Sequence, residues 1–140
     1  MSKHASTSHA ISLNPANGQV FAEYPFEQAD DLERSLARAA AGFKTWRKTP
    51  VSARAEQLRK MAQALRHNAE TMAQMITAEM GKPIVQARAE VEKCAVTCEW
   101  YAEHGPAMLA PEKTPVENAK AYNDYLPLGS ILAVMPWNFP

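Results

Sequence analysis

The chain has 140 residues, of which 46% are apolar, and its 15 basic residues are balanced by 15 acidic ones. This composition is typical of a folded domain and argues against a wholly disordered chain. A net charge of zero without any long Lys/Arg run argues against a nucleic-acid partner, and no apolar run approaches the roughly 18 residues that span a membrane.

The first part of the chain is expected to be a tail followed by a β-hairpin. Residues 1–9 lack the apolar core of a secretory signal, so they are expected to form a disordered tail. Two cysteines without an export signal favour a cytoplasmic location. Strand-like runs at 10–13 and 19–24 flank Asn17-Gly18, which supplies the positive φ angles of a tight hairpin turn.

Apolar residues at helical spacing predict two amphipathic helices after the hairpin. Asp30 and Glu33 resemble a capping box at the start of the first, which runs to Trp46. The second begins after Thr49, with Pro50 in its first turn, and continues for close to thirty residues until residues 81–83 stop it.

A third helix is expected to end at residues 105–106, and a proline-rich crossing to follow it at 106–115. Residues 119–126 are interpreted as an irregular edge strand. The third helix carries its apolar stripe at Ile84, Ala87, Val91, Cys94, Cys98 and Tyr101.

The last predicted element is a strand at residues 131–135, after a turn at 127–129. Its continuous apolar run is typical of a strand buried on both faces of a parallel sheet. Such a strand needs neighbours for its backbone groups, and the sequence continues for only five more residues. We therefore expect the sequence to be a truncated part of a larger α/β protein.

Three ordered motifs resemble the aldehyde dehydrogenase superfamily, and the resemblance covers residues 11–140. They are Asn-Pro-Ala-Asn-Gly at 14–18, Glu-Met-Gly-Lys-Pro at 79–83 followed by Ala-Glu-Val at 89–91, and Pro-Trp-Asn-Phe-Pro at 136–140. The first departs at Asn17 from the family's usual Asn-Pro-Ala-Thr-Gly. The sequence of residues 99–105 is similar to that of bacterial succinate-semialdehyde dehydrogenases.

The resemblance implies an α/β aldehyde dehydrogenase fold. Residues 10–126 would hold the N-terminal hairpin and the three helices, and residues 127–140 the first strand of a Rossmann-like cofactor domain. The implied activity is oxidation of an aldehyde, expected to be succinate semialdehyde, to its acid with NAD or NADP through a cysteine thiohemiacetal. A homo-oligomer, either dimer or tetramer, is also implied, with strand 119–126 in the intersubunit sheet.

Asn138 is the catalytic residue that the resemblance assigns to this chain. Its side-chain amide would donate to the oxyanion that forms when a cysteine thiolate attacks the aldehyde. Pro136 and Pro140 would fix the backbone on either side of it. The nucleophilic cysteine and the glutamate that activates water would lie beyond Pro140, so the chain alone is expected to be inactive. The cofactor cleft would be lined by Val134, Met135, Pro136, Trp137 and Asn138.

Several residues of the third helix have a functional and a structural interpretation. Cys94, Cys98 and His104 have the spacing of metal ligands, but cysteines on an apolar stripe are favoured as small buried residues, so no metal site is expected. Trp100, Tyr101 and His104 are candidates for a substrate entrance, although ordinary packing is favoured.

Other features are also given their structural interpretation. Lys82 and Arg88 could attract a substrate carboxylate, yet scattered charges of this kind usually form solvated faces. The methionines at 61, 72, 75 and 80 are interpreted as core. The alternative to an enzyme fragment is a non-catalytic helical interaction or oligomerisation module, because amphipathic helices can pack on a partner without any cofactor.

Overall fold

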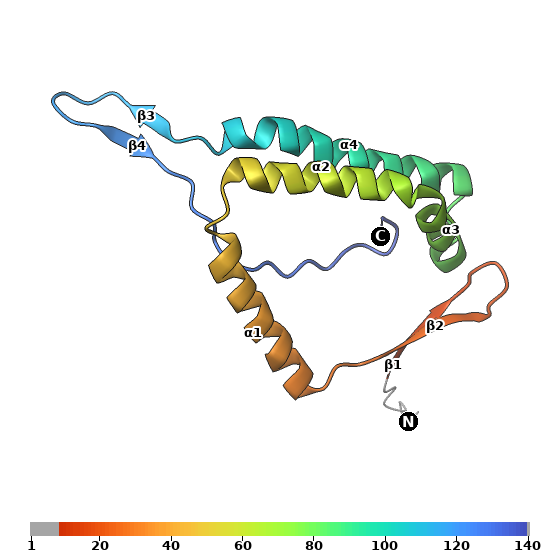
Figure 1. Cartoon of the computed structure of the whole chain (residues 1–140). Helices are drawn as coiled ribbons and strands as arrows, with labels where there is room; N and C mark the ends of the chain where they lie inside the picture. The colour runs from red at the N-terminus through yellow and green to blue at the C-terminus, as the bar shows by residue number, and fades with distance from the viewer. Residues whose placement is uncertain (1–8, 140) are drawn as a thin grey trace, which may run out of the picture.

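The computed structural model describes residues 9–139, in which α2 and α4 lie side by side, α3 packs against α4 at one end of this pair, and two β-hairpins stand apart from one another (Figure 1). The predicted tail lies outside the described residues except for His9, which begins the first strand. The elements are β1 His9–Leu13, β2 Val20–Pro25, α1 Ala29–Trp46, α2 Val51–His67, α3 Ala69–Met80, α4 Ile84–Met108, β3 Glu112–Thr114 and β4 Ala121–Asn123.

The predicted N-terminal hairpin is confirmed to within one residue, but its turn is wider than expected. β1 and β2 pair antiparallel, and the loop spans Asn14 to Gln19, whose backbones are joined at 2.8 Å. Gly18 adopts φ +70°, whereas Asn17 does not enter the left-handed region. The Asn14 side chain accepts from the backbone N–H of Ala16 at 2.9 Å, and this local bond stabilises the longer loop.

The N-cap of the first helix lies two residues earlier than the sequence indicated. Gln28 is the N-cap of α1 with extended backbone angles, and its backbone N–H donates to the Asp31 carboxylate at 3.4 Å. The proposed pair of Asp30 and Glu33 is therefore wrong, because both already lie inside the helix. No residue of α1 is buried, so its apolar face is open to solvent.

The long second helix predicted from the sequence is two helices, α2 and α3, that meet at Asn68. Asn68 has φ −101° and ψ 11°, outside the helical range, and its side chain donates to the Ala64 carbonyl at 2.8 Å. Asparagine side chains compete in this way with backbone helix bonds, which explains the break. The predicted end of α3 is confirmed, because Gly81 caps it at φ +77°.

The core is formed by small residues between α2, α3 and α4, and it allows these helices to approach closely (Figure 1). On α4 the buried side is displaced from the predicted stripe, since Ala95 is fully buried whereas Cys94 is exposed. The contact with α2 selects this alanine side. The buried residues are Ala55, Ala62, Ala73, Ala87, Val91, Ala95 and Ala102.

Large apolar side chains are mostly exposed in this structure. Met61 and Met75 are more than half exposed, so the interpretation of the methionines as core is wrong; alanines occupy the helix interface instead. Exposed apolar surface of this extent is typical of faces that pack against further protein. No helix within residues 9–139 combines the length and the apolarity needed to cross a membrane.

The region after α4 contains more structure than its prolines predicted. The helix continues past Pro106 to Met108, because a proline near a helix end removes few hydrogen bonds. β3 follows within the predicted irregular crossing and pairs with β4. The expected strand at 119–126 is thus confirmed only for its central residues, Ala121–Asn123. This second hairpin projects from the end of the helical layer (Figure 1).

The apolar run at residues 131–135 is not a strand in this structure, contrary to the sequence prediction. It has no regular secondary structure, and Ile131 and Val134 are 85% and 86% exposed. A strand is stabilised by ladder hydrogen bonds, and no described strand runs beside this segment to supply them. The segment is instead attached through Ser130, whose hydroxyl donates to the Ala39 carbonyl of α1 at 3.1 Å.

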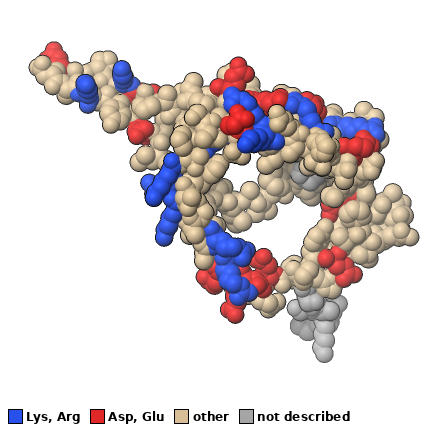
Figure 2. All heavy atoms as spheres, in the orientation of Figure 1, with Lys and Arg blue, Asp and Glu red and all other residues tan. Residues whose placement is uncertain are grey.

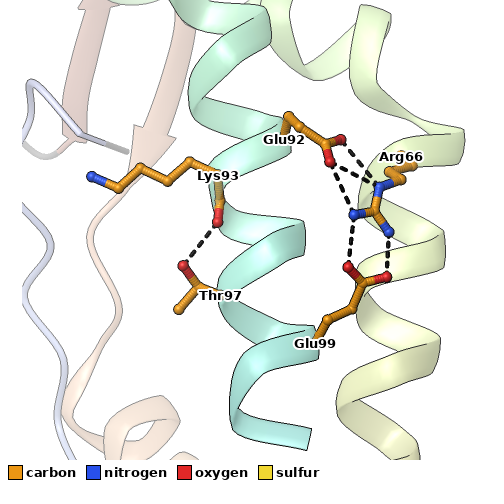
Figure 3. Close-up of polar contacts among 5 residues, drawn as sticks. All are labelled: Arg66, Glu92, Lys93, Thr97 and Glu99. Atoms are coloured by element: carbon orange, nitrogen blue, oxygen red, sulfur yellow. Dashed lines mark hydrogen bonds and ion pairs between the residues drawn. The ribbon is translucent and has the colours of Figure 1, made fainter. Parts of the chain in front are cut away.

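Charged side chains of both signs are interspersed on the face shown in Figure 2. Arg66 of α2 lies between Glu92 and Glu99 of α4 and donates to both carboxylates, at 2.9 and 2.8 Å (Figure 3). These hydrogen bonds lower the pKa of Glu99. A second pair joins α4 to α3, where the hydrogen bond from Arg88 lowers the pKa of Glu70 to about 2. Because all five groups are exposed, their contribution to stability is small.

Candidate functional site

The end of α3 brings together the segments that carry two of the three sequence motifs. The hydroxyl of Ser12 in β1 donates to the Glu79 carboxylate at 2.8 Å. Pro15 of the hairpin loop lies so close to Gly81 that a Cβ on this glycine would be 3.0 Å from the proline Cγ. The loop at 14–18 therefore rests against the residues that end α3 (Figure 1).

Residues of the third motif lie near the same place, because they line a cavity of about 650 Å³ together with residues of α3 and the hairpin loop. Three methionines of α3 that the sequence assigned to the core instead face this cavity, and the adaptable thioether side chain suits such an irregular wall. Residues from the hairpin loop, from α3 and from the third motif line it together: Pro15, Met72, Met75, Ile76, Glu79, Met80, Met135, Pro136 and Trp137.

Asn138 occupies a tight turn at the edge of this cavity. The backbone N–H of Phe139 donates to the Pro136 carbonyl at 3.2 Å, which places Trp137 and Asn138 at the two central positions of the turn. The Asn138 side chain is exposed and forms no hydrogen bond within residues 9–139. Its amide is consequently available to an external acceptor. Pro140, the second predicted flanking proline, lies outside the described residues.

Lys82 fixes the backbone of this turn, a role that sequence reasoning missed. Its ammonium group donates to the Asn138 carbonyl at 2.9 Å, forms an ion pair with Glu90 of α4, and lies 4.1 Å from the centre of the Phe139 ring. Only 11% of the Lys82 side chain is exposed, so its interpretation as a solvated surface charge is wrong. Its position between a glycine and a proline was the available signal, because both residues restrict the backbone.

The predicted cofactor-lining residues are only partly brought together. Met135, Pro136 and Trp137 line the cavity, whereas Val134 and Asn138 are not among its lining residues. Trp137 and Met135 are 78% and 66% exposed, so they offer apolar surface that suits a flat aromatic ring such as nicotinamide. The cation beside the turn, Lys82, is already paired with Glu90, and a cofactor phosphate would need another partner.

The remaining candidates on α4 have local partners. His104 stacks on Trp100 with ring centres 4.5 Å apart, and its Nδ1 lies 2.8 Å from the Trp100 carbonyl. Cys98 and Tyr101 line a separate cavity of about 350 Å³ between α2 and α4. Within residues 9–139, no group of three or more His, Cys, Asp or Glu side chains is placed to hold a metal ion. Arg88 is paired with Glu70, but its side chain is 51% exposed, which agrees with its interpretation as part of a solvated face.

Comparison with known proteins decides the family. The model of the aldehyde dehydrogenase family matches residues 2–140. The chain belongs to this family. All three motifs lie within the matched residues, and they come together around the end of α3.

Among aldehyde dehydrogenases, the chain is similar to enzymes named for succinate semialdehyde. It is 61% identical over 132 residues to the succinate semialdehyde dehydrogenase [NAD(P)+] of Escherichia coli (strain K12), covering 94% of this chain and 29% of that protein. It is 41% identical over 134 residues to succinate-semialdehyde dehydrogenase [NADP(+)] 1 of Mycobacterium tuberculosis (strain H37Rv), covering 92% and 29%. The chain therefore spans less than a third of the length of these relatives.

Solved aldehyde dehydrogenase structures share the fold. The succinic semialdehyde dehydrogenase of Streptococcus pyogenes, in complex with NADP+, matches with a TM-score of 0.74 and 28% identity over 81% of this chain and 25% of that one. An aldehyde dehydrogenase of Brucella melitensis biovar abortus 2308 matches with a TM-score of 0.72 and 28% identity over 79% and 23%. These matches confirm the predicted α/β fold class of the chain.

Proposed function

We propose that this chain forms the N-terminal part of an enzyme that oxidises succinate semialdehyde to the acid with NAD or NADP. The observation that carries the proposal is the 61% identity to the Escherichia coli enzyme across 94% of the chain. Both other proteins named above for this substrate are similar over most of the same residues. The proposed location of the whole enzyme is the cytoplasm.

Asn138 is the residue of this chain that acts on the substrate. When a cysteine thiolate adds to the aldehyde carbon, a carbon–sulfur bond forms and the electron pair of the carbonyl bond moves to oxygen. The Asn138 side-chain amide donates a hydrogen bond to that oxyanion. The open position of this amide in the turn at 136–139, with no competing acceptor among residues 9–139, supports the assignment.

The apolar residues next to this turn would hold the cofactor. Val134, Met135, Pro136 and Trp137 provide the surface, and their exposed side chains support the proposal. When bound, NAD or NADP would supply the acceptor for the hydride that leaves the former aldehyde carbon. The nucleophilic cysteine is expected in the part of the enzyme that follows residue 140, since neither Cys94 nor Cys98 lines the cavity beside Trp137. By the resemblance to the family, the glutamate that activates water is expected there as well.

A chimeric enzyme tests the proposed function directly. In it, this chain replaces the matching 29% of the Escherichia coli relative. We expect the chimera to form NAD(P)H from succinate semialdehyde with a kcat within about tenfold of the parent, because the replaced segment retains the same turn and helices. The 140-residue chain alone, assayed as the control, is expected to show no turnover.

An inactive chimera that folds would contradict the enzyme proposal. It would favour the alternative of a non-catalytic helical interaction or oligomerisation module, for which the supporting observation is the apolar face of α1, where no residue is buried. Turnover by the 140-residue chain would contradict the assignment of the nucleophile to another segment. The fold of each protein is checked by circular dichroism before the assay.

We further propose that the hairpin of β3 and β4 pairs with another subunit in a homo-oligomer. All residues of β3 are exposed, and no other described strand pairs with this two-stranded sheet, so its outer edges are open to a partner. We expect the chimera to have the mass of a dimer or tetramer by light scattering, and Lys113→Pro in β3 to shift the mass toward the monomer. A monomeric chimera would contradict this proposal.

A further inference from the structure

The ion pair between Lys82 and Glu90 is enclosed to a degree that the other ion pairs are not. Its side chains are 11% and 9% exposed, whereas the side chains in the other ion pairs within residues 9–139 are 34% to 62% exposed. Removing two charges from water is unfavourable unless their hydrogen bonds are well satisfied. A pair in this environment therefore contributes little to stability by itself, and its main effect is to fix the position of the Lys82 ammonium group.

The Lys82 ammonium group has three contacts within the protein. A lysine ammonium has three N–H donors and no acceptor. One side faces the Glu90 carboxylate, one donates to the Asn138 carbonyl at 2.9 Å, and the group lies 4.1 Å from the centre of the Phe139 ring. An enclosed cation over an aromatic face is itself stabilised, so all three contacts favour a single ammonium position.

The backbone on either side of Lys82 holds the residue in place. Gly81 ends α3 in the left-handed conformation, and Pro83 is the N-cap of α4. The link between the two helices is thus only three residues long, and two of these have a restricted or special backbone geometry. Glu90 lies within α4, which packs against α3. The pair is consequently anchored to the helical layer and not to the mobile end of a loop.

We propose that Lys82, held by Glu90, is a positioning residue for the Asn138 amide; this rests on the oxyanion role proposed above. The Asn138–Phe139 peptide is held at both ends, because its carbonyl accepts from Lys82 and its N–H donates to the Pro136 carbonyl. Fixing this peptide plane fixes the backbone from which the Asn138 side chain projects. The amide then needs no hydrogen bond of its own to be oriented.

Amide hydrogen exchange on the 140-residue chain tests this positioning without any assay of activity. We expect Lys82→Met to accelerate exchange of the Phe139 backbone amide by about tenfold or more, because a hydrogen bond to a charged donor no longer holds its peptide plane. Arg88→Met is the matched control, since it removes a nearby cation, in the first turns of α4, whose partner is the exposed Glu70. The control should leave Phe139 exchange unchanged.

The double variant Lys82→Met/Glu90→Gln separates positioning from general stability, because it leaves no unpaired buried carboxylate. We expect α2 and α4 to retain their protection in this variant while Phe139 exchange stays fast. Unchanged Phe139 exchange would overturn the proposal. Protection lost equally from Phe139, α2 and α4 in the double variant would also overturn it, since the pair would then stabilise the whole layer.

Kinetics of the chimera provide the functional readout. Lys82→Met is expected to lower kcat by about 10²-fold with little change in KM, because a displacement of about 1 Å in a catalytic group has an effect of this size. A rise in KM at constant kcat would overturn the positioning role. If the chimera has no activity before the substitution, the proposed function fails, while the exchange measurement still decides whether Lys82 positions the turn.

Discussion

Asn138→Ala in the chimera is expected to lower kcat by about 10²–10³-fold, or roughly 2.7–4 kcal/mol of transition-state stabilisation. The substitution removes the side-chain amide from the turn, but it leaves in place the backbone bonds that Lys82 and Phe139 form there. An interaction made only with the oxyanion contributes to the transition state and not to substrate binding. We therefore expect kcat and kcat/KM to fall by the same factor, measured by steady-state NAD(P)H formation.

Two further variants define what this result means. Asn138→Asp has nearly the same size but places a carboxylate next to the oxyanion, so its kcat should be at least as low as that of Asn138→Ala. Gln57→Ala removes an exposed amide from α2, away from the turn, and should leave kcat unchanged. A kcat for Asn138→Ala within about threefold of the unchanged chimera would contradict the oxyanion role.

The elements that the sequence predicted well are those set by neighbouring residues. The β1–β2 hairpin followed from turn residues between two short apolar runs, and the end of α3 followed from Gly81. Both depend on local backbone preferences, which can be read without knowing the rest of the fold. The break at Asn68 was also a local effect, but helical periodicity continues across it and obscured it.

Features that depend on distant residues could not be predicted in this way. Periodicity indicated a buried stripe on α4, yet the side that is buried depends on α2, and this contact selected Ala95 in place of Cys94. The interaction of Lys82 with Asn138 joins residues 56 positions apart in sequence. The motif identified Asn138 as the candidate. That Lys82 holds the Asn138 backbone depends on the tertiary structure, which brings the link between α3 and α4 next to the turn.

The junction between α3 and α4 also explains why a glycine is needed at position 81. Gly81 has φ +77°, a conformation that costs other residues about 1–2 kcal/mol, and an added Cβ would lie 3.0 Å from the Cγ of Pro15. Two separate penalties therefore act on the same methyl group. One arises from the backbone of the residue itself, and the other from the hairpin loop that rests against it.

Gly81→Ala is accordingly expected to lower the free energy of unfolding of the 140-residue chain by about 2 kcal/mol, measured by urea denaturation followed by circular dichroism. Gly105→Ala is the matched control. Gly105 lies within α4 with nothing within 4 Å of the added Cβ, so alanine there should stabilise the chain by about 0.5–1 kcal/mol. Opposite signs for the same chemical change would show that conformation and contact, not glycine content, determine the effect.

The double variant Pro15→Ala/Gly81→Ala separates the two penalties. If the hairpin loop rests on the end of α3, removing the proline ring relieves the close contact. The loss of unfolding free energy in the double variant should then be smaller than the sum of the two single losses, by about 0.5–1 kcal/mol. Strictly additive effects would mean that the backbone conformation alone accounts for the loss. The hairpin loop would then be free of α3 in solution, and the cavity that Pro15 shares with Met135 and Trp137 would not be a stable feature of the chain.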